Sequence, residues 1–530
     1  MPSDPVPAPR RAGASLLLVL LLVGAALLRL PGLGSPPTDI HHVRQADTSS
    51  IARNFYRDGV DLLRPRIDWA GPDAGTVESE LPLYAAATAG LWRAAGTTDP
   101  AWPRALSVLS WMLGALALWR LVRRRLEGPA WPYLALYLLS PLAIAFSRTV
   151  QPDASAVALL LWSLERCDAA GDRDGGGLGA ALWGGLLGGL AVAAKGTLGF
   201  AAPLLLLLAV GRGGKGASLR AAATALLTLT LPALWYAHAH ANLGVDGATF
   251  GLWGSGAHKW GGPAIWADLG TWRALVGTLL TLTLTPLGAV LVGAGVLAAR
   301  LEAGLRPWVL GLGLGLGTMV VLAEGFRLHN YYQLMLVPFA SVLAGAGARW
   351  AAARAREGGA AAAGMVVLLL ALGALSAWQG LAFARDALRR DSRIEVAGLA
   401  LSYVVPANHA VLVVDEHPQT LLYAIDRRGF HRSTVSYGDV LQLEDLGAEY
   451  LVITETSPSW SDPGLMTALE DERPLVARSP GWLLFQLQKE RPRRVRPVTS
   501  TEAAVEGEGA EGGDEAPAGS GHPLDEGQEP

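Results

Sequence analysis

The stretches Arg44-Gln45-Ala46-Asp47-Thr48 and Glu78-Ser79-Glu80-Leu81-Pro82-Leu83-Tyr84 belong to one polar loop, residues 31–103, between the first two of many apolar segments. The loop is crowded with ionisable side chains. A membrane protein rarely keeps a long charged loop directly after its first span unless the loop has a function. Carboxylates in both stretches, next to a lipid phase, therefore indicate chemistry at a membrane surface.

Composition supports a membrane location. The chain has 530 residues, of which 51% are hydrophobic and 17% are charged, and its mean hydropathy is +0.31. This combination excludes an ordinary soluble protein and is typical of polytopic helical membrane proteins. Cys167 is the only cysteine, which excludes an intramolecular disulfide and argues against cysteine-based metal or redox chemistry. The chain has no P-loop and no nucleic-acid motif.

The apolar segments predict an α-helical polytopic protein with about eleven transmembrane helices. Their centres lie near Leu20, Leu113, Leu138, Leu160, Leu187, Leu205, Leu227, Leu282, Leu314, Val342 and Leu368. The Lys and Arg residues of the short loops all fall on one side if the first span runs outward, as the positive-inside rule requires. A cleaved signal peptide is the alternative for the first span, but no convincing small-residue cleavage site follows it, so an uncleaved helix is preferred.

This orientation defines four regions. Residues 1–12 form a cytoplasmic N-terminus, and residues 13–380 form the transmembrane domain of an integral cytoplasmic (inner) membrane protein. The loop 31–103 and everything after the last span then lie on the extracytoplasmic side. Residues 381–490 predict a small α/β domain with strands at 410–415, 421–425, 450–454 and 482–487. The composition of residues 491–530 predicts a disordered acidic tail.

Two carboxylates of the loop are candidates for catalysis. Asp47 is expected at the N-cap of a short interfacial helix that Gly59 ends, and Glu80 precedes a second helix that starts at Pro82. Capping alone would explain an acidic residue at a helix start. The sharper interpretation is a catalytic or metal-binding carboxylate at the lipid–water boundary. Glu78 lies on the same side of an extended segment as Glu80 and remains an alternative to it.

Three further polar clusters border the membrane on the same expected side. They are Arg148 to Asp153, the isolated Lys195, and the segment Arg327-Leu328-His329-Asn330-Tyr331-Tyr332-Gln333. Ionisable groups near spans are costly and usually functional. Basic side chains would suit a phosphate, and His and Tyr would suit a sugar. The structural alternatives are an Arg148–Asp153 ion pair, a lysine that extends to the interface, and an ordinary interfacial belt of aromatic residues.

These motifs, in this order, resemble the GT-C superfamily of glycosyltransferases, which take sugars from polyprenyl-phosphate carriers. The similarity is greatest to the bacterial protein O-mannosyltransferase and lipid A aminoarabinose transferase group. It rests on Arg44 to Thr48 with Ile51-Ala52-Arg53-Asn54, on Glu80 to Tyr84, and on the clusters around Arg148, Lys195 and His329. Members commonly carry an Asp-Glu pair where this chain has Arg44-Gln45, so the early carboxylate is either Asp47 or Asp39.

The resemblance implies transfer of a hexose or pentose from a polyprenyl-phosphate carrier to a lipid, glycan or protein acceptor of the cell envelope. Asp47 or Glu80 would act on the attacking hydroxyl, and Arg148, Lys195 and Arg327 would bind the donor phosphate. Substrate binding is expected from Arg44, Gln45, Asp153, His329, Tyr331 and Tyr332. No cofactor is certain, and a divalent metal remains open. A flippase of a lipid-linked sugar is the alternative, and a non-catalytic scaffold is a third class.

Overall fold

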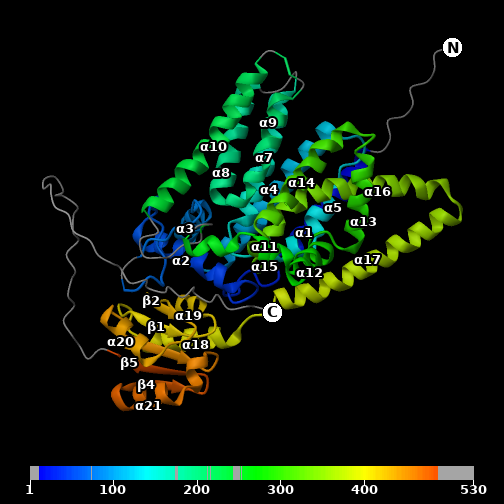
Figure 1. The fold of residues 1–530 in the computed structure, drawn as a ribbon. Helices are drawn as coiled ribbons and strands as arrows, with labels where there is room; N and C mark the ends of the chain where they lie inside the picture. The colour runs from blue at the N-terminus through cyan, green and yellow to red at the C-terminus, as the bar shows by residue number, and fades with distance from the viewer. Residues whose placement is uncertain are drawn as a thin grey trace, which may run out of the picture.

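The computed structural model describes residues 11–72, 75–172, 177–211, 213–214, 216–242, 251 and 254–487 (Figure 1). The expected acidic tail, residues 491–530, lies outside the described residues. Two parts are evident: a large helical body and a small C-terminal α/β domain, with the helices of the first polar loop between them.

In the described part of the chain, the helical body consists of α1, the loop helices α2 and α3, and the helical segments from α4 to α16. Their bounds are α1 (Arg11–Leu27), α2 (His42–Asp58), α3 (Leu83–Ala95), α4 (Ala101–Arg125), α5 (Trp131–Leu139), α6 (Pro141–Phe146), α7 (Asp153–Gly171), α8 (Gly177–Ala194), η1 (Gly196–Ala201), α9 (Ala202–Val210), α10 (Ala217–Asn242), η2 (Gly254–Lys259), α11 (Pro263–Ala267), α12 (Leu269–Thr278), the π-helix η3 (Leu279–Thr283), α13 (Pro286–Ala298), η4 (Ala303–Leu305), α14 (Arg306–Val321), α15 (Ala323–Leu328), η5 (Asn330–Leu336) and α16 (Val337–Glu357). The long helix α17 (Gly359–Ala387) follows and leads to the C-terminal domain.

Each of the expected span centres falls in a helical segment, and the chain is a multi-pass membrane protein. Within the described residues, six helical stretches are long and apolar enough to cross a membrane, or seven if a bent pair counts as one span. The expected number of eleven is therefore not confirmed. The segment around Leu282 accounts for one of the differences, because it bends by 92° between Thr283 and Pro286. Thr285 adopts a left-handed conformation there (φ 64°), and a proline starts the next helix.

In the first polar loop, the second expected helix is confirmed and the first begins earlier than expected. Pro82 caps α3, which ends at Ala95. Helix α2 starts at His42 and ends before Gly59, so Asp47 lies inside it and is not its N-cap. A left-handed residue, His41, marks the true start. The capping explanation for Asp47 is therefore wrong, and its burial needs another reason.

The C-terminal domain has a five-stranded sheet with the order β2-β1-β3-β5-β4. Its elements are α18 (Ser392–Val404), β1 (Val411–Val414), α19 (Pro418–Ile425), β2 (Gly429–Arg432), α20 (Tyr437–Asp445), β3 (Tyr450–Thr454), η6 (Pro458–Ser461), α21 (Pro463–Glu472), β4 (Leu475–Ser479) and β5 (Trp482–Gln486). Strands β2, β1 and β3 are parallel, and β5 and β4 are antiparallel to their neighbours. Helices α18 and α19 share one apolar core with the sheet, and α20 and α21 share the other.

The α/β class is confirmed, with one element of the wrong type. Three of the expected strands correspond to β1, β3 and β5, but residues 421–425 belong to helix α19. Pro418 at the start of that helix fixes a helical φ and needs no hydrogen-bond donor there. The edge strands β2 and β4 were not predicted from the sequence.

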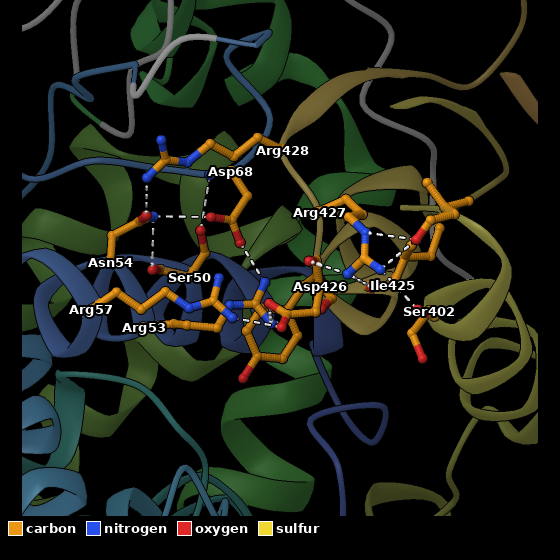
Figure 2. A network of polar contacts seen from close by, with 12 residues as sticks. Ser50, Arg53, Asn54, Arg57, Asp68, Ser402, Ile425, Asp426, Arg427 and Arg428 are labelled. Atoms are coloured by element: carbon orange, nitrogen blue, oxygen red, sulfur yellow. Dashed lines mark hydrogen bonds and ion pairs between the residues drawn. The ribbon is translucent and has the colours of Figure 1, made fainter. Parts of the chain in front are cut away.

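The C-terminal domain is docked on α2 by a polar network (Figure 2). Arg53 donates to Asp68 (2.5 Å) and to the Tyr423 carbonyl (2.9 Å), and its guanidinium lies over the Tyr423 ring. Arg53 also pairs with Asp426 (2.8 Å). The Gly71 N–H donates to the Gly429 carbonyl at 2.7 Å, so the first loop forms an isolated β-bridge with the edge strand β2. The loop and the domain thus share backbone as well as side-chain bonds.

Candidate functional site

Lys195 is placed by α8, a glycine-rich helix held tightly between α7 and α10. A Cβ on Gly189 would lie 2.4 Å from the Leu227 carbonyl oxygen, so only glycine allows this approach. Ser163 of α7 donates to the Gly184 carbonyl at 2.6 Å. Because α8 is fixed along its length, the residue that follows its last turn has a defined position, and that residue is Lys195, which is 4% exposed.

The segment that carries Glu80 is tied to the same end of α8. The Leu81 backbone donates to the Ala193 carbonyl at 2.9 Å, and the Trp235 indole donates to the Ser79 carbonyl at 3.1 Å. Tyr236 of α10 donates to carbonyls at the end of α8. Glu80, which lies between two anchored residues, therefore faces Lys195. The sequence analysis did not identify the two anchoring aromatic residues.

We call the group around this lysine the Lys195 cluster, which consists of Arg44, Glu80, Asp153, Lys195, Tyr331 and Tyr332. The Lys195 ammonium lies 3.2 Å from Asp153 and 3.7 Å from Glu80, whose other oxygen accepts from Arg44 at 2.7 Å. The ammonium also faces the rings of Tyr332 (4.5 Å) and Tyr331 (5.1 Å). The six residues come from five separate parts of the sequence, and the structure brings them to one place.

The two cations control the charge state of Glu80. Burial alone would raise the pKa of Glu80, but Arg44 and Lys195 outweigh burial and lower the pKa to about 2. Glu80 is therefore ionised at any physiological pH. A carboxylate that binds its proton so weakly is well suited to hold cations and accept hydrogen bonds, and poorly suited to remove a proton.

The aromatic side of the cluster includes His41 and His329. His329 packs against Tyr331 and Tyr332, with ring centroids at 5.5 and 5.3 Å, and His41 contacts Tyr331 edge-on at 5.1 Å. Burial, together with nearby cations led by Lys259, lowers the pKa of His329 well below its ordinary value. His329 is thus neutral and adds no charge to the cluster.

Arg148 belongs to a second group, which we call the Asp39 network: Asp39, Gln45, Arg104 and Arg148. The Asp39 carboxylate accepts four hydrogen bonds. Two come from the terminal nitrogens of Arg104 (3.0 and 2.9 Å), one from Arg148 (3.0 Å) and one from the Gln45 amide (2.7 Å). All four side chains are buried. The alternative of an Arg148–Asp153 pair is wrong, because Arg148 pairs with Asp39 and Asp153 pairs with Lys195.

Arg104 was missed by the sequence analysis, although a signal for it existed. It lies in the first turn of the apolar helix α4 and is fully buried. An isolated charge in such a helix is costly and indicates a partner. The identity of that partner, Asp39, could be known only from the fold.

Arg327 and Glu78 have partners outside the Lys195 cluster. Arg327 pairs with Glu324 in its own helix α15, and Asp268 contributes to its electrostatic environment. Glu78 faces His240 of α10 at 3.5 Å. The three cations expected to bind the phosphate, Arg148, Lys195 and Arg327, therefore lie in three separate ion-pair groups.

Asp47 connects the first loop to the C-terminal domain. It is 6% exposed and accepts the Trp69 indole at 2.9 Å, and the Trp69 ring packs on His431 of β2 at 4.7 Å. Asp47 also lies one turn after Arg44 on α2 and acts electrostatically on it. The structure thus brings both candidate carboxylates, Asp47 and Glu80, next to Arg44.

Near the cluster, several buried polar atoms lack a hydrogen-bond partner. Among the described residues they are one carboxylate oxygen of Asp153 and both amide atoms of Gln151, and in the adjoining Asp39 network the Nε atoms of Arg104 and Arg148. Such atoms are rare in folded proteins and point to a missing ligand or water. Within the described part of the chain, no three His, Cys, Asp or Glu side chains come together as a metal site would need.

Comparisons with known proteins identify the fold. No family model matches the chain, and no curated protein matches it by sequence. Among solved structures, ArnT from Cupriavidus metallidurans in the apo state has a TM-score of 0.62 and 15% identity, and the match covers 90% of this chain and 99% of ArnT. The same protein bound to undecaprenyl phosphate has a TM-score of 0.59 and 15% identity, with 91% and 100% of the two chains covered.

Two further glycosyltransferases share the architecture. The oligosaccharyltransferase AglB from Archaeoglobus fulgidus, solved with an inhibitory peptide and dolichol-phosphate, has a TM-score of 0.58 and 10% identity, over 84% of this chain and 69% of AglB. The arabinofuranosyltransferase AftD from Mycobacteria has a TM-score of 0.56 and 15% identity, over 91% of this chain and 42% of AftD. The chain therefore shares the fold of these glycosyltransferases, as the sequence resemblance predicted, and the subgroup is not defined by these likenesses.

Proposed function

We propose that this protein is a membrane glycosyltransferase that moves a sugar from a polyprenyl-phosphate carrier to an acceptor hydroxyl. The observation that carries the proposal is the Lys195 cluster, a buried lysine held between two carboxylates and two tyrosine rings. The GT-C fold supports the reaction type, because one of its structural neighbours is solved with undecaprenyl phosphate and another with dolichol-phosphate.

In the proposed reaction, the acceptor oxygen attacks the anomeric carbon and the bond from that carbon to the carrier phosphate breaks. The phosphate leaves as an anion, and Lys195 offsets its charge in a site largely shielded from water, where charge interactions are strong. Arg44 is a second cation close by, bound to Glu80. Arg148 is proposed to act through structure, because its guanidinium is already bound to Asp39.

We assign the two loop carboxylates different roles. Glu80, whose pKa is held low by Arg44 and Lys195, keeps both cations in place and accepts hydrogen bonds from substrate hydroxyls. Asp47 is the proposed proton acceptor for the attacking hydroxyl. His329, Tyr331 and Tyr332 lie on the same side of Lys195 and would contact the sugar. Gln45 would support the region without touching the substrate, because its amide is bonded to Asp39, the Ile40 carbonyl and the Val150 backbone.

Turnover in proteoliposomes tests this function. The protein is supplied with a polyprenyl-phosphate-linked sugar and a candidate acceptor. Release of polyprenyl phosphate with glycosylation of the acceptor supports a transferase. Reorientation of the donor across the bilayer without cleavage supports the flippase alternative and overturns the proposal. The same reaction, run with acceptor on one side of the vesicle at a time, tests whether the site faces the extracytoplasmic side.

A further inference from the structure

The C-terminal domain contains a cleft of about 210 Å³ that is separate from the Lys195 cluster. It lies at the carboxyl ends of β1 and β3, next to the start of α18. Asp415 follows β1 directly, Thr454 ends β3, and Thr456 comes two residues later. On the other side, the β4–β5 hairpin contributes Ser479 and Trp482, which face each other across the two strands.

The sheet topology makes this the expected place for a ligand. From the carboxyl end of β1 the chain enters α19, and from the carboxyl end of the neighbouring strand β3 it enters η6 and α21. Helices α19 and α21 lie on opposite faces of the sheet. Connections that diverge in this way leave a crevice at the carboxyl ends of the strands, where open α/β sheets bind their ligands.

The lining of the cleft defines the chemistry of the ligand. Two threonine hydroxyls, those of Thr454 (2.5 Å) and Thr456 (2.9 Å), donate to Asp415, and the Thr456 oxygen also accepts from the Glu416 backbone at 3.4 Å. Each hydroxyl oxygen has two lone pairs, so each can still accept a hydrogen bond from a ligand. The apolar wall consists of Ile394, Leu421 and Trp482, all largely buried. Hydroxyl and carboxylate groups beside an aromatic ring suit a sugar, which offers both hydroxyls and an apolar face.

The charge and the size of the cleft further restrict the class of ligand that it can bind. Three carboxylates line the cleft, Asp391, Asp415 and Glu455, against one cation, Arg393, which is paired with Asp391 at 2.9 Å. This excess of negative charge disfavours phosphates and acidic sugars. The volume is below the about 300–1,000 Å³ of most drug-sized ligand sites, so a single ring fits better than an extended glycan.

The cleft is also joined to the loop that carries the candidate active site. The Asp391 backbone donates to the Thr38 carbonyl at 2.9 Å, and the Thr38 hydroxyl donates to Glu395 at 2.5 Å. On the other side, His417 packs on His42 of α2 at 4.4 Å. A sugar in the cleft would therefore sit beside the residues that precede Arg44.

We propose that this cleft binds a non-acidic sugar ring, neutral or amino-substituted, of the acceptor. The role as an acceptor subsite rests on the proposed glycosyltransferase function, whereas binding of the sugar itself does not. The cleft would hold one ring of the acceptor in the C-terminal domain while the attacking hydroxyl reaches the Lys195 cluster. No bond is made or broken in the cleft.

Saturation-transfer NMR on the full-length protein in lipid nanodiscs, without donor, tests the binding. The probes are glucose, glucosamine and glucuronate, which share a ring and differ in charge. We expect saturable transfer to glucose and glucosamine, and at least about fivefold weaker binding of glucuronate because like charges repel. Absence of saturable binding for all three sugars, or a preference for glucuronate, would overturn the proposal.

Two variants locate the binding. Ser479→Trp fills the cleft opposite Trp482 on an edge strand that accepts aromatic residues, and should abolish the signal. Thr456→Val removes one hydroxyl and should weaken binding several-fold, about threefold or more. Glu470→Gln, on the exposed face of α21, is the matched control and should bind like the wild type. Unchanged binding by Ser479→Trp overturns the assignment to this cleft.

The two proposals can fail separately. If wild-type protein binds glucose but releases no polyprenyl phosphate in proteoliposomes, the proposed function fails and the sugar site remains. If polyprenyl phosphate is released and no sugar binds, only the cleft assignment fails. If both hold, Ser479→Trp should raise the KM for the acceptor more than it lowers kcat, and an equal loss in both would contradict the subsite role.

Discussion

The Lys195 cluster and the Asp39 network are built from the same kinds of side chain, but their buried charged groups differ in how completely they are hydrogen-bonded. In the Asp39 network, one carboxylate accepts four hydrogen bonds of 2.7 to 3.0 Å from three buried side chains. In the Lys195 cluster, the lysine contacts its two carboxylates at 3.2 and 3.7 Å, and one oxygen of Asp153 has no partner. The Asp39 carboxylate is fully bonded, and the unpartnered atoms of its network are the Nε groups of Arg104 and Arg148, which can only donate. The Lys195 cluster instead has a carboxylate oxygen available to accept a hydrogen bond from a ligand.

This difference separates structural from functional charge. A buried carboxylate whose hydrogen-bond positions are all filled holds the fold, and its loss leaves its cationic partners uncompensated. A buried charge with longer contacts and unpaired neighbours can exchange a protein partner for a substrate. The two groups adjoin, because Gln45 bonds Asp39 while Arg44, the preceding residue, bonds Glu80. Substitutions in each should therefore change different measured quantities.

The largest effect is expected for Asp39→Asn. The substitution removes the only carboxylate of the Asp39 network and leaves Arg104 and Arg148 buried without a counter-charge. The free energy of unfolding should fall by about 3–5 kcal/mol. Thermal unfolding in detergent measures this loss. Asp58→Asn is the control, because its ion pairs with Arg66 and Arg428 are partly exposed and worth about 0–1 kcal/mol. Equal losses for the two variants would refute a structural role for Asp39.

Lys195→Ala should abolish most of the transfer activity of correctly folded protein. Removing one preorganised group that stabilises developing negative charge costs about 100- to 1,000-fold in rate. Lys195→Arg should retain more activity than Lys195→Ala, because a guanidinium partly replaces the ammonium. Initial rates per folded molecule in proteoliposomes provide the measurement. Arg354→Ala, at an exposed ion pair, serves as control, and near-normal rates for Lys195→Ala would exclude Lys195 from the site.

The carboxylates of the loop should separate by role. Asp47→Asn keeps a side chain that accepts the Trp69 bond and removes the base, so the rate should fall about 100-fold with little loss of stability. Glu80→Gln should lower the rate less, by about tenfold. This substitution weakens a charge-assisted hydrogen bond but does not remove the proton acceptor. Glu78→Gln, facing an exposed histidine, is the control. If Asp47→Asn and Glu80→Gln both transfer sugar at the wild-type rate, neither carboxylate takes part in the reaction.

The smallest effect concerns acid stability. The pKa of Glu80 is lowered from an ordinary value of 4.5 to about 2, so its contribution to stability is complete above pH 4.5 and is lost as the pH falls toward 2. The difference in unfolding temperature between wild type and Glu80→Gln should be constant from neutral pH to about pH 5 and shrink below it. A difference that grows on acidification would contradict the ion pairs assigned to Glu80.

Much of the fold was predictable from the sequence, because apolar segments and strands have strong periodic signals. The expected strands at 410–415 and 450–454 became β1 and β3, which are buried. The edge strand β4 is mostly exposed and has no such signal, and α19 resembles a strand by composition alone. The start of α2 was misplaced because a left-handed histidine marks it, and no sequence rule predicts that conformation at His41.

The candidate site was predictable as a set of residues but not as a set of contacts. The sequence singles out the residues of the Lys195 cluster because they are charged or aromatic and border apolar segments. They are Arg44, Glu80, Asp153, Lys195, Tyr331 and Tyr332. Their pairing depends on how distant helices approach. Lys195 meets Asp153 and Glu80, whereas Arg148 joins Asp39, more than one hundred positions away. Local spacing allowed an Arg148–Asp153 pair as a structural alternative, and tertiary packing gave each residue a different partner.

Binding of undecaprenyl phosphate to the purified protein, measured for wild type, Lys195→Ala and Arg148→Ala, tests the division between the two groups most directly. The account predicts at least about tenfold weaker binding by folded Lys195→Ala, equivalent to 1.4 kcal/mol. Arg148→Ala should unfold at a lower temperature, and its folded fraction should bind like the wild type. Normal binding by Lys195→Ala together with weak binding by folded Arg148→Ala would contradict the account.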